Sequence, residues 1–361
     1  MAPMPLLRRV FVAVALLVFG ALTTRADAAA PGPLGALQTE LSTMSMHAPG
    51  NVGIMVEDLA TGLSTSVNAG AQMPAASTIK IPVMVEVFKR LAQGDFDLNR
   101  KVSLQPSDRD SGWGDLDSAP TGAQYTVSRL LTLMITESDN TATNMLIRLV
   151  GRRAINDEMA DLGLTQTALH DYIRSDGPIR YALRSSAYDM VKLMTEMARF
   201  QLIDEWSSRE MIAIMTGQHH NGLIPVPLPR GTLIAHKTGE LHDTLDDVGV
   251  VYLNSEPYAI AVMTTNLDTL DAGYHFIQGV SRIAYDALAR FAVWRQANDY
   301  AATMPLVSAP SPGAPSAGPP VDTAADTSAA RDLKMWIPVN QPASALPANA
   351  PAEPTENPPA N

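Results

Sequence analysis

The stretch that organises this chain is Ser77-Thr78-Ile79-Lys80-Ile81-Pro82, which is followed by the run VMVEVFKRL. Apolar residues recur through this run at helical spacing, which predicts a mostly buried helix that begins at Ser77. Pro82 is compatible with a helix start because the first backbone N–H groups have no partner within the helix. Residues three apart share a helix face, so the Lys80 amine can reach the Ser77 hydroxyl.

This pairing of a serine with a lysine predicts a nucleophile for acyl transfer. A hydroxyl is a weak nucleophile until a neighbouring base takes its proton, and a helix N-terminus adds partial positive charge where an oxyanion would form. A Ser-x-x-Lys pattern is expected about once by chance in a chain of this length. Taken alone, the pattern therefore favours a simpler interpretation, a capping serine and a solvated lysine.

Two further motifs favour the catalytic interpretation of Ser77 over the capping one. Ser138-Asp139-Asn140 is predicted on a loop between helices, and Lys237-Thr238-Gly239 on a strand. Each is expected well under once by chance, roughly a tenth at average residue usage. Together with the runs ITESDNTATNML and AHKTG, the ordered set resembles the penicillin-recognising serine enzymes, most closely the class A β-lactamase-like group. The resemblance covers about residues 34–301.

The resemblance implies an acyl-enzyme mechanism with three catalytic residues. Ser77 would be the nucleophile, and Lys80 would accept its proton if the pocket holds the amine neutral. Ser138 would pass a proton to the leaving nitrogen. Asp139 is expected to brace its loop from inside rather than to touch the substrate.

The resemblance also implies five substrate-binding residues. Asn140 would bind the substrate amide and help to hold Lys80. Lys237 and Thr238 would bind the substrate carboxylate, and Gly239 would let the backbone approach the substrate. The backbone N–H groups of Ser77 and Glu240 would form the oxyanion hole. The Glu240 carboxylate could repel anionic substrates or select cationic ones, although its side chain is expected to point to solvent.

One segment departs from the family pattern. Class A enzymes carry a glutamate in the irregular loop after the second motif, where it activates the water that releases the acyl group. Residues 168–186 contain no glutamate, and Ile173 falls where the acid is expected. Two aspartates could replace it or could instead form ion pairs that tie the loop down: Asp171 and Asp176, with Arg174 and Arg180. We therefore expect acylation to be intact and hydrolysis of the acyl-enzyme to be slow.

The other chemistry-bearing residues give weaker signals. His219-His220 and the pair His236 and His242 lack the spacing of a metal site, so we expect no metal and no other cofactor. Trp113 is equally compatible with a cleft wall and with a core position. The segment from His242 to Asp247 is interpreted as a solvated connection.

The chain is predicted to adopt an α+β fold. Two strand patterns precede a helical middle and three follow it, which predicts one antiparallel five-stranded sheet flanked by helices and interrupted by an inserted all-helical lobe. The expected domain spans residues 29–303. Its sheet lobe would comprise about 34–95 and 225–302 and its helical lobe about 96–224, with a substrate cleft between them.

The two ends of the chain differ from this domain in composition. Residues 1–28 combine a basic start, an apolar run and a small-residue site, which predicts a signal peptide and hence a periplasmic or secreted protein with no remaining membrane span. Residues 304–361 are rich in proline and alanine and are predicted to be disordered, with a cell-envelope component as a possible partner. The sequence has no cysteine, which excludes disulfides and thiol chemistry.

The net charge of the chain limits the kinds of binding partner, and three hypotheses on its function remain. Removal of residues 1–28 takes away three arginines and one aspartate and moves the formal charge from −11 to about −13, which argues against nucleic acid as a partner. The first hypothesis is a β-lactamase-like hydrolase of a β-lactam or a related amide or ester. The second is a peptidoglycan D-Ala-D-Ala carboxypeptidase or an esterase. The third is a non-hydrolytic penicillin-binding or sensor module.

Overall fold

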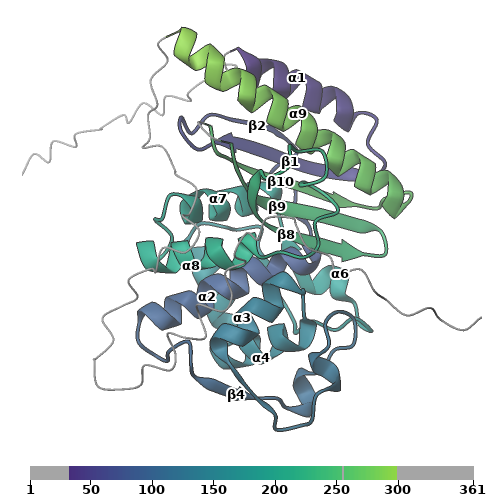
Figure 1. Cartoon of the computed structure of the whole chain (residues 1–361). Helices are drawn as coiled ribbons and strands as arrows, with labels where there is room; N and C mark the ends of the chain where they lie inside the picture. Colours follow the sequence, from purple (N-terminus) through teal and green to yellow (C-terminus); the bar gives the residue numbers. More distant parts are fainter. Residues whose placement is uncertain (1–31, 254–255, 299–361) are drawn as a thin grey trace, which may run out of the picture.

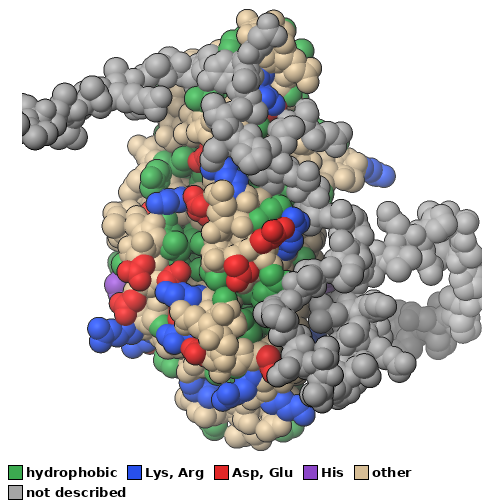
Figure 2. Space-filling view, turned by 90° about the vertical axis from the view of Figure 1, so that its left-hand side faces the viewer, with side chains coloured by type: hydrophobic (Ala, Val, Ile, Leu, Met, Phe, Trp, Pro, Cys, Tyr) green, Lys and Arg blue, Asp and Glu red, His purple; other side chains and the backbone are tan. Residues whose placement is uncertain are grey.

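The structure of the chain is a computed structural model that describes residues 32–253 and 256–298 (Figure 1). The predicted signal peptide (1–28) and the predicted tail (304–361) lie outside the described residues. Within the described ranges, no helix is both long enough and apolar enough to cross a bilayer. On the face turned to the viewer in Figure 2, acidic and basic side chains are interspersed rather than gathered by sign.

Five strands form one antiparallel sheet, in the order β2-β1-β10-β9-β8. Their bounds are β1 Asn51–Asp58, β2 Ser64–Val67, β8 Leu233–Leu241, β9 Thr244–Tyr252 and β10 Tyr258–Thr265. Both ends of the chain contribute to this sheet, which confirms the predicted α+β architecture. Every residue of β9 and β10 is buried, because helices cover both faces of the sheet.

The first and last helices cover one face of the sheet. α1 (Pro33–Ser45) and α9 (Leu270–Ala297) lie side by side above the strands in Figure 1. α1 presents Leu34, Leu37 and Leu41 to this interface, and alternate residues of β1 face the same core. Each fully buried side chain of this size contributes about 1.5–3 kcal/mol, so this helix pair fixes the sheet from the side away from the Ser77 turn.

The remaining helices lie on the other side of the sheet and form the second core. They are α2 Lys80–Ala92, α3 Val127–Thr136, α4 Asn140–Val150, α5 Arg152–Asp161, α6 Ile179–Ala182, α7 Ala187–Ala198 and α8 Glu205–Thr216. α7 packs directly against β1, β9 and β10, and α8 packs against β8. α2 is buried along nearly its whole length.

Short elements connect these layers. They are β3 Met73–Pro74, β4 Lys101–Ser103, β5 Gln124–Thr126, β6 Ala168–Leu169 and β7 Leu183–Ser185, with single 3₁₀ turns η1 Ala76–Ile79, η2 Pro106–Asp108 and η3 Leu116–Ser118. β3, β7 and β6 form a small sheet beside the η1 turn. The segment between β6 and β7 therefore leaves and re-enters the core close to Ser77.

Candidate active site

Ser77 lies in the η1 turn, immediately before α2. The prediction of a helix that begins at Ser77 is wrong in this detail, because α2 begins at Lys80. Ala76 has a φ of 41°, which turns the chain sharply before the serine. β8 approaches this turn so closely that a Cβ on Gly239 would lie 3.2 Å from the Ser77 backbone nitrogen. A side chain at position 239 would therefore crowd the contact between the strand and the turn.

The Lys80 amine is at the centre of a network that joins the first two motifs. Its Nζ lies 3.0 Å from Ser77 Oγ and 3.0 Å from Ser138 Oγ. It also donates to the Ser138 carbonyl at 2.6 Å and to Asn140 Oδ1 at 2.8 Å. The carbonyl and amide oxygens can only accept hydrogen bonds. A neutral amine has two N–H groups, and both are used by these oxygens, so its lone pair is left for a serine hydroxyl.

The surroundings of Lys80 favour that neutral state. The side chain is fully buried. Burial lowers the pKa of the Lys80 amine well below its usual range, and the charge of nearby Lys237 lowers the pKa further, whereas Asp139 and Asp110 oppose the shift. An amine held in this way is able to accept a proton at neutral pH.

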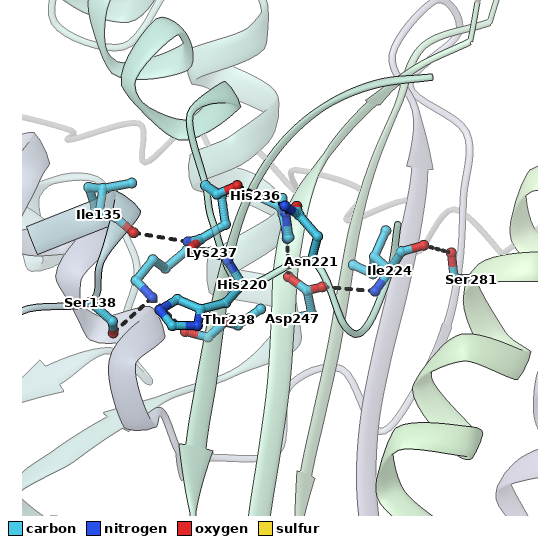
Figure 3. Close-up of polar contacts among 11 residues, drawn as sticks. Ile135, Ser138, His220, Asn221, Ile224, His236, Lys237, Thr238, Asp247 and Ser281 are labelled. Carbon is cyan, nitrogen blue, oxygen red and sulfur yellow. Dashed lines mark hydrogen bonds and ion pairs between the residues drawn. The ribbon is translucent and has the colours of Figure 1, made fainter. Parts of the chain in front are cut away.

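The third motif meets the other two at Ser138. Lys237 Nζ donates to Ser138 Oγ at 3.1 Å and to the Thr238 carbonyl at 2.9 Å. Figure 3 shows the Lys237 side chain reaching from β8 toward the Ser138 hydroxyl. Burial lowers the pKa of Lys237 to about 7. Ser138 has a φ of 58°, a strained conformation that holds its hydroxyl between the Lys80 and Lys237 amines.

Asp139 supports this loop and does not enter the cavity. Its carboxylate caps α4 by accepting from Ala142 N at 2.7 Å, and it accepts from Leu116 N at 3.0 Å. Burial raises the pKa of Asp139, and the hydrogen bonds from the two backbone donors offset only part of this shift. The predicted bracing role agrees with these contacts.

A carboxylate that the sequence analysis missed lies behind Asn140. Asp110 Oδ1 accepts from Asn140 Nδ2 at 2.7 Å, from Ser175 Oγ at 2.6 Å and from Gly112 N at 3.1 Å. Asp110 Oδ2 accepts from Ser175 N at 2.6 Å. Burial alone would raise the pKa of Asp110, but the hydrogen bonds from Ser175 and Asn140 outweigh it and lower the pKa. Asp110 fixes the Asn140 amide so that its oxygen faces Lys80.

The loop between β6 and β7 presents no carboxylate to this network. Ile173 is buried, and the Asn144 side chain binds both its backbone N–H (2.9 Å) and its carbonyl (3.0 Å). The side chain of this loop that contacts Asn140 is that of Ser175, at 3.3 Å. The residue that Asn144 of α4 holds in this way is an isoleucine. The loop therefore has no acid here, in agreement with the expectation from the sequence.

The ion pairs predicted inside this loop are wrong. Arg180 pairs with Asp243 in the β8–β9 connection and also donates to Asn266 Oδ1. Arg174 donates to the Ser107 carbonyl. Both arginines therefore tie the loop to other parts of the domain instead of to its own aspartates.

A cavity of about 470 Å³, part of it open to solvent, leads to Ser77 and Ser138. Trp113 lines it, 42% exposed, with its ring edge against His220 at a centroid distance of 5.3 Å. Trp113 is thus a cleft wall. Glu240 also lines the cavity and accepts a hydrogen bond from the Tyr274 hydroxyl at 3.0 Å. The expectation that Glu240 points to solvent is wrong, because α9 brings a tyrosine to meet it.

A second buried network holds the cavity wall against β8 and β9 (Figure 3). Asp247 Oδ1 lies 2.9 Å from His236 Nδ1, and Asp247 Oδ2 accepts from Ile224 N at 2.9 Å. His236 Nε2 contacts Asn221 Oδ1 at 3.0 Å. Asp246 and Asp247 are fully buried, so the prediction of a solvated connection is wrong for both. Among the described residues, no cluster of histidines and acids could hold a metal ion.

Comparison with known proteins agrees with this geometry. The profile described as "Beta-lactamase enzyme family" matches residues 36–288. The solved structure of PBP-A has 30% sequence identity and a TM-score of 0.67, covering 73% of this chain and all of that one. A β-lactamase from Sphaerobacter thermophilus has 29% identity and a TM-score of 0.65, covering 72% of this chain and 97% of that one. The L158E mutant of PBP-A, an acyl-enzyme complex with penicillin G, has 29% identity and a TM-score of 0.68, covering 72% and 100%. The chain belongs to the β-lactamase family of serine hydrolases.

Proposed function

We propose that the protein is an exported serine hydrolase that forms an acyl-enzyme on Ser77 with β-lactams or related amides and esters. The single observation that carries this proposal is the Lys80 amine. Its N–H groups are used by two acceptors, and its lone pair is available 3.0 Å from the Ser77 hydroxyl. The composition of residues 1–28 supports export, and a cell-envelope partner for residues 304–361 stays a proposal.

The acylation step follows from these positions. Lys80 takes the proton of Ser77, and the Ser77 oxygen forms a bond to the substrate carbonyl carbon. The backbone N–H groups of Ser77 and Glu240 stabilise the oxyanion. Ser138 then gives its proton to the leaving atom as the carbonyl bond to that atom breaks. Ser138 regains a proton from Lys80, which is 3.0 Å away.

Release of the acyl group is expected to be slow. A general base for the hydrolytic water needs a free lone pair and a suitable pKa. Asp110, the acid that binds both Asn140 and this loop, accepts four hydrogen bonds and has a lowered pKa. Ile173 supplies no base. The PBP-A mutant at 29% identity is an acyl-enzyme complex with penicillin G, which supports β-lactams as acyl donors.

The second candidate function is acyl transfer or hydrolysis on a peptidoglycan-like stem, or on an ester. The observation that favours it is the same loop, because enzymes of the wider group that act on cell walls do not use the missing glutamate. This function shares Ser77, Lys80 and Ser138 with the first. It differs from the first in the leaving group that Ser138 would protonate.

Mass spectrometry of the intact protein tests the proposal. Incubation with penicillin G should add one penicillin mass to the wild type, and the adduct should persist through buffer exchange. Ser77→Ala should show no adduct under the same conditions. An unchanged adduct on Ser77→Ala would contradict the assignment of the nucleophile, and rapid turnover of nitrocefin by the wild type would contradict slow release.

A further inference from the structure

The segment between α8 and β8 forms part of the cavity wall and has no helix or strand of its own. His220, Gly222 and Leu223 from this segment line the cavity that leads to Ser77. Residues 218–224, which we call the 218–224 wall, have no sheet partner, so their position depends on hydrogen bonds from other elements. The contacts that hold this wall therefore affect the shape of the cavity.

His236 on β8 is a buried side chain that contacts the 218–224 wall. It is 1% exposed, and its ring lies between Asp247 of β9 and Asn221 of the wall (Figure 3). The residue paired with it on β9 is Gly249, where a Cβ would lie only 2.6 Å from the His236 Cβ. Side chains two apart on a strand share a face, so His236 lies on the same face of β8 as Thr238, which lines the cavity.

Both ring nitrogens of His236 face an oxygen that accepts hydrogen bonds. Asn221 Oδ1 lies 3.0 Å from Nε2, and Asp247 Oδ1 lies 2.9 Å from Nδ1. The Asn221 Nδ2 donates to the Gln218 carbonyl at 2.9 Å, and the opposite orientation of this amide would place two acceptor oxygens together. Asp247 Oδ2 accepts from Ile224 N at 2.9 Å. Each ring nitrogen of His236 therefore carries a hydrogen, and the ring is an imidazolium that the Asp247 carboxylate balances.

This ion pair joins the wall to β8 and β9 at two points. The histidine binds the Asn221 side chain, and the aspartate binds the backbone of Ile224. From α9, Ser281 Oγ donates to the Ile224 carbonyl at 2.8 Å. The hydrogen bonds given above for Lys80 and Lys237 go to residues outside the wall. A change at Asn221 thus alters the wall without removing a hydrogen bond from either amine.

We propose that His236 is a positioning residue for substrate binding, which as an imidazolium paired with Asp247 holds the 218–224 wall in place through Asn221. This inference rests on the proposed function and adds to it. Without the contact, the substrate loses a fixed surface, whereas Ser77 and Lys80 keep their geometry. The expected loss therefore falls on the binding of the acyl donor more than on the chemical step.

Substitution of Asn221 tests the positioning role, because this residue is exposed and the variant should fold. The rate of labelling by a fluorescent penicillin is measured against penicillin concentration, which separates the half-saturating concentration from the limiting acylation rate. Asn221→Ala should raise the half-saturating concentration about fivefold and change the limiting rate by less than about twofold. Asn99→Ala removes another exposed asparagine and should leave both quantities unchanged. Asp247 is left in place, because its charge also raises the pKa of Lys237.

NMR of the histidine rings tests the charge of His236. In the wild type at pH 7, both of its ring nitrogens should carry slowly exchanging hydrogens, assigned by the absence of their signals from His236→Gln. If that variant does not fold, the Nε2–H signal is identified by its shift in Asn221→Ala. A ring with one bare nitrogen overturns the ion pair. An unchanged half-saturating concentration in Asn221→Ala, or a loss confined to the limiting rate, overturns the positioning role. Failure of penicillin to label the wild type at all instead counts against the proposed function itself.

Discussion

Of two regions around Ser77, one has the groups for acylation in place, whereas the other lacks a base for hydrolysis of the acyl-enzyme. In the first, η1, the loop before α4, and β8 bring two lysines to one serine hydroxyl, at 3.0 and 3.1 Å. Burial lowers the pKa of both amines, so a base is available without any rearrangement. In the second, between β6 and β7, an isoleucine occupies the expected place of the acid. The nearby Asp110 has its oxygens filled by donors.

The difference shows that acyl-enzyme formation and its hydrolysis depend on separate structural elements. The acylating groups are held by buried secondary structure, whereas the hydrolytic base would have to come from an irregular loop. Such a loop can lose its acid without disturbing the lysines, because the side chains of Asn144 and Asp110 hold it by accepting hydrogen bonds from its backbone N–H groups. A chain built in this way is expected to accumulate the acyl-enzyme.

The largest predicted effect is on the acylation rate in the first region, when the Lys80 amine is removed. Lys80→Ala leaves Ser77 without a proton acceptor, so acylation by penicillin G should slow about 10²–10⁴-fold. The rate is measured by fluorescent penicillin labelling at several times. Lys89→Ala removes a lysine from the same helix, one that pairs with Glu158, and should label within about twofold of the wild type. Labelling of Lys80→Ala at the wild-type rate would remove the amine from the mechanism.

A second change should create a base in the second region. Ile173→Glu places a carboxylate in the loop bound by Asn144, so the penicillin adduct should release about tenfold faster or more. Ile173→Gln has the same shape as the glutamate variant but supplies no base, and should release at the wild-type rate. Both variants should lose stability, because Ile173 is buried. The measurement is the half-life of the adduct after removal of excess penicillin. Equal half-lives for the two variants would show that a carboxylate at position 173 does not speed hydrolysis of the acyl-enzyme.

Asp110 connects the two regions, and its removal should have an intermediate effect. Asp110→Ala frees the Asn140 amide to rotate, so Lys80 loses a fixed acceptor and acylation should slow by about tenfold. Asp115→Asn changes an exposed carboxylate close by and serves as the control. The measurement is the acylation rate constant at saturating penicillin, with thermal unfolding recorded for each variant. A variant that is less stable but acylates at the wild-type rate would limit Asp110 to a folding role.

The sequence predicted the first region better than the second for a physical reason. The contact between Ser77 and Lys80 is set within one helical turn, and the motifs around Ser138 and Lys237 carry their own local geometry. Asp110 acquires its role from partners 30 and 65 positions away, and no short pattern marks it. Glu240 is oriented by Tyr274, 34 positions later, so its strand position alone suggested solvent.

The burial of Asp246 could not be predicted from the sequence, for a related reason. A run of acidic residues indicates a solvated segment when it is considered by composition alone. β9 is nevertheless a central strand with helices on both of its faces, and its residues are buried whatever their charge. The packing of α7 and α9 on this strand joins segments far apart in the chain. The pattern of the strand itself does not contain this information.

Asp246 gives the smallest predicted effect, and it concerns stability rather than chemistry. Its Oδ1 accepts from Thr264 N at 3.0 Å, whereas its Oδ2 is buried without a hydrogen-bond partner. Burial raises the pKa of Asp246 well above its usual range. The folded-state pKa exceeds the unfolded value, so its contribution to stability is complete below the unfolded pKa and is lost as pH rises through the folded pKa.

Asp246→Asn keeps a neutral side chain of the same shape at every pH. The free energy of unfolding of this variant should therefore exceed that of the wild type by on the order of 1 kcal/mol at pH 8, with the gap closing toward pH 4. Urea unfolding at both pH values measures it, and Asp268→Asn, an exposed position, provides the comparison. A gap of the same size at both pH values would mean that Asp246 does not titrate. β9 would then hold a charged carboxylate at a fully buried position.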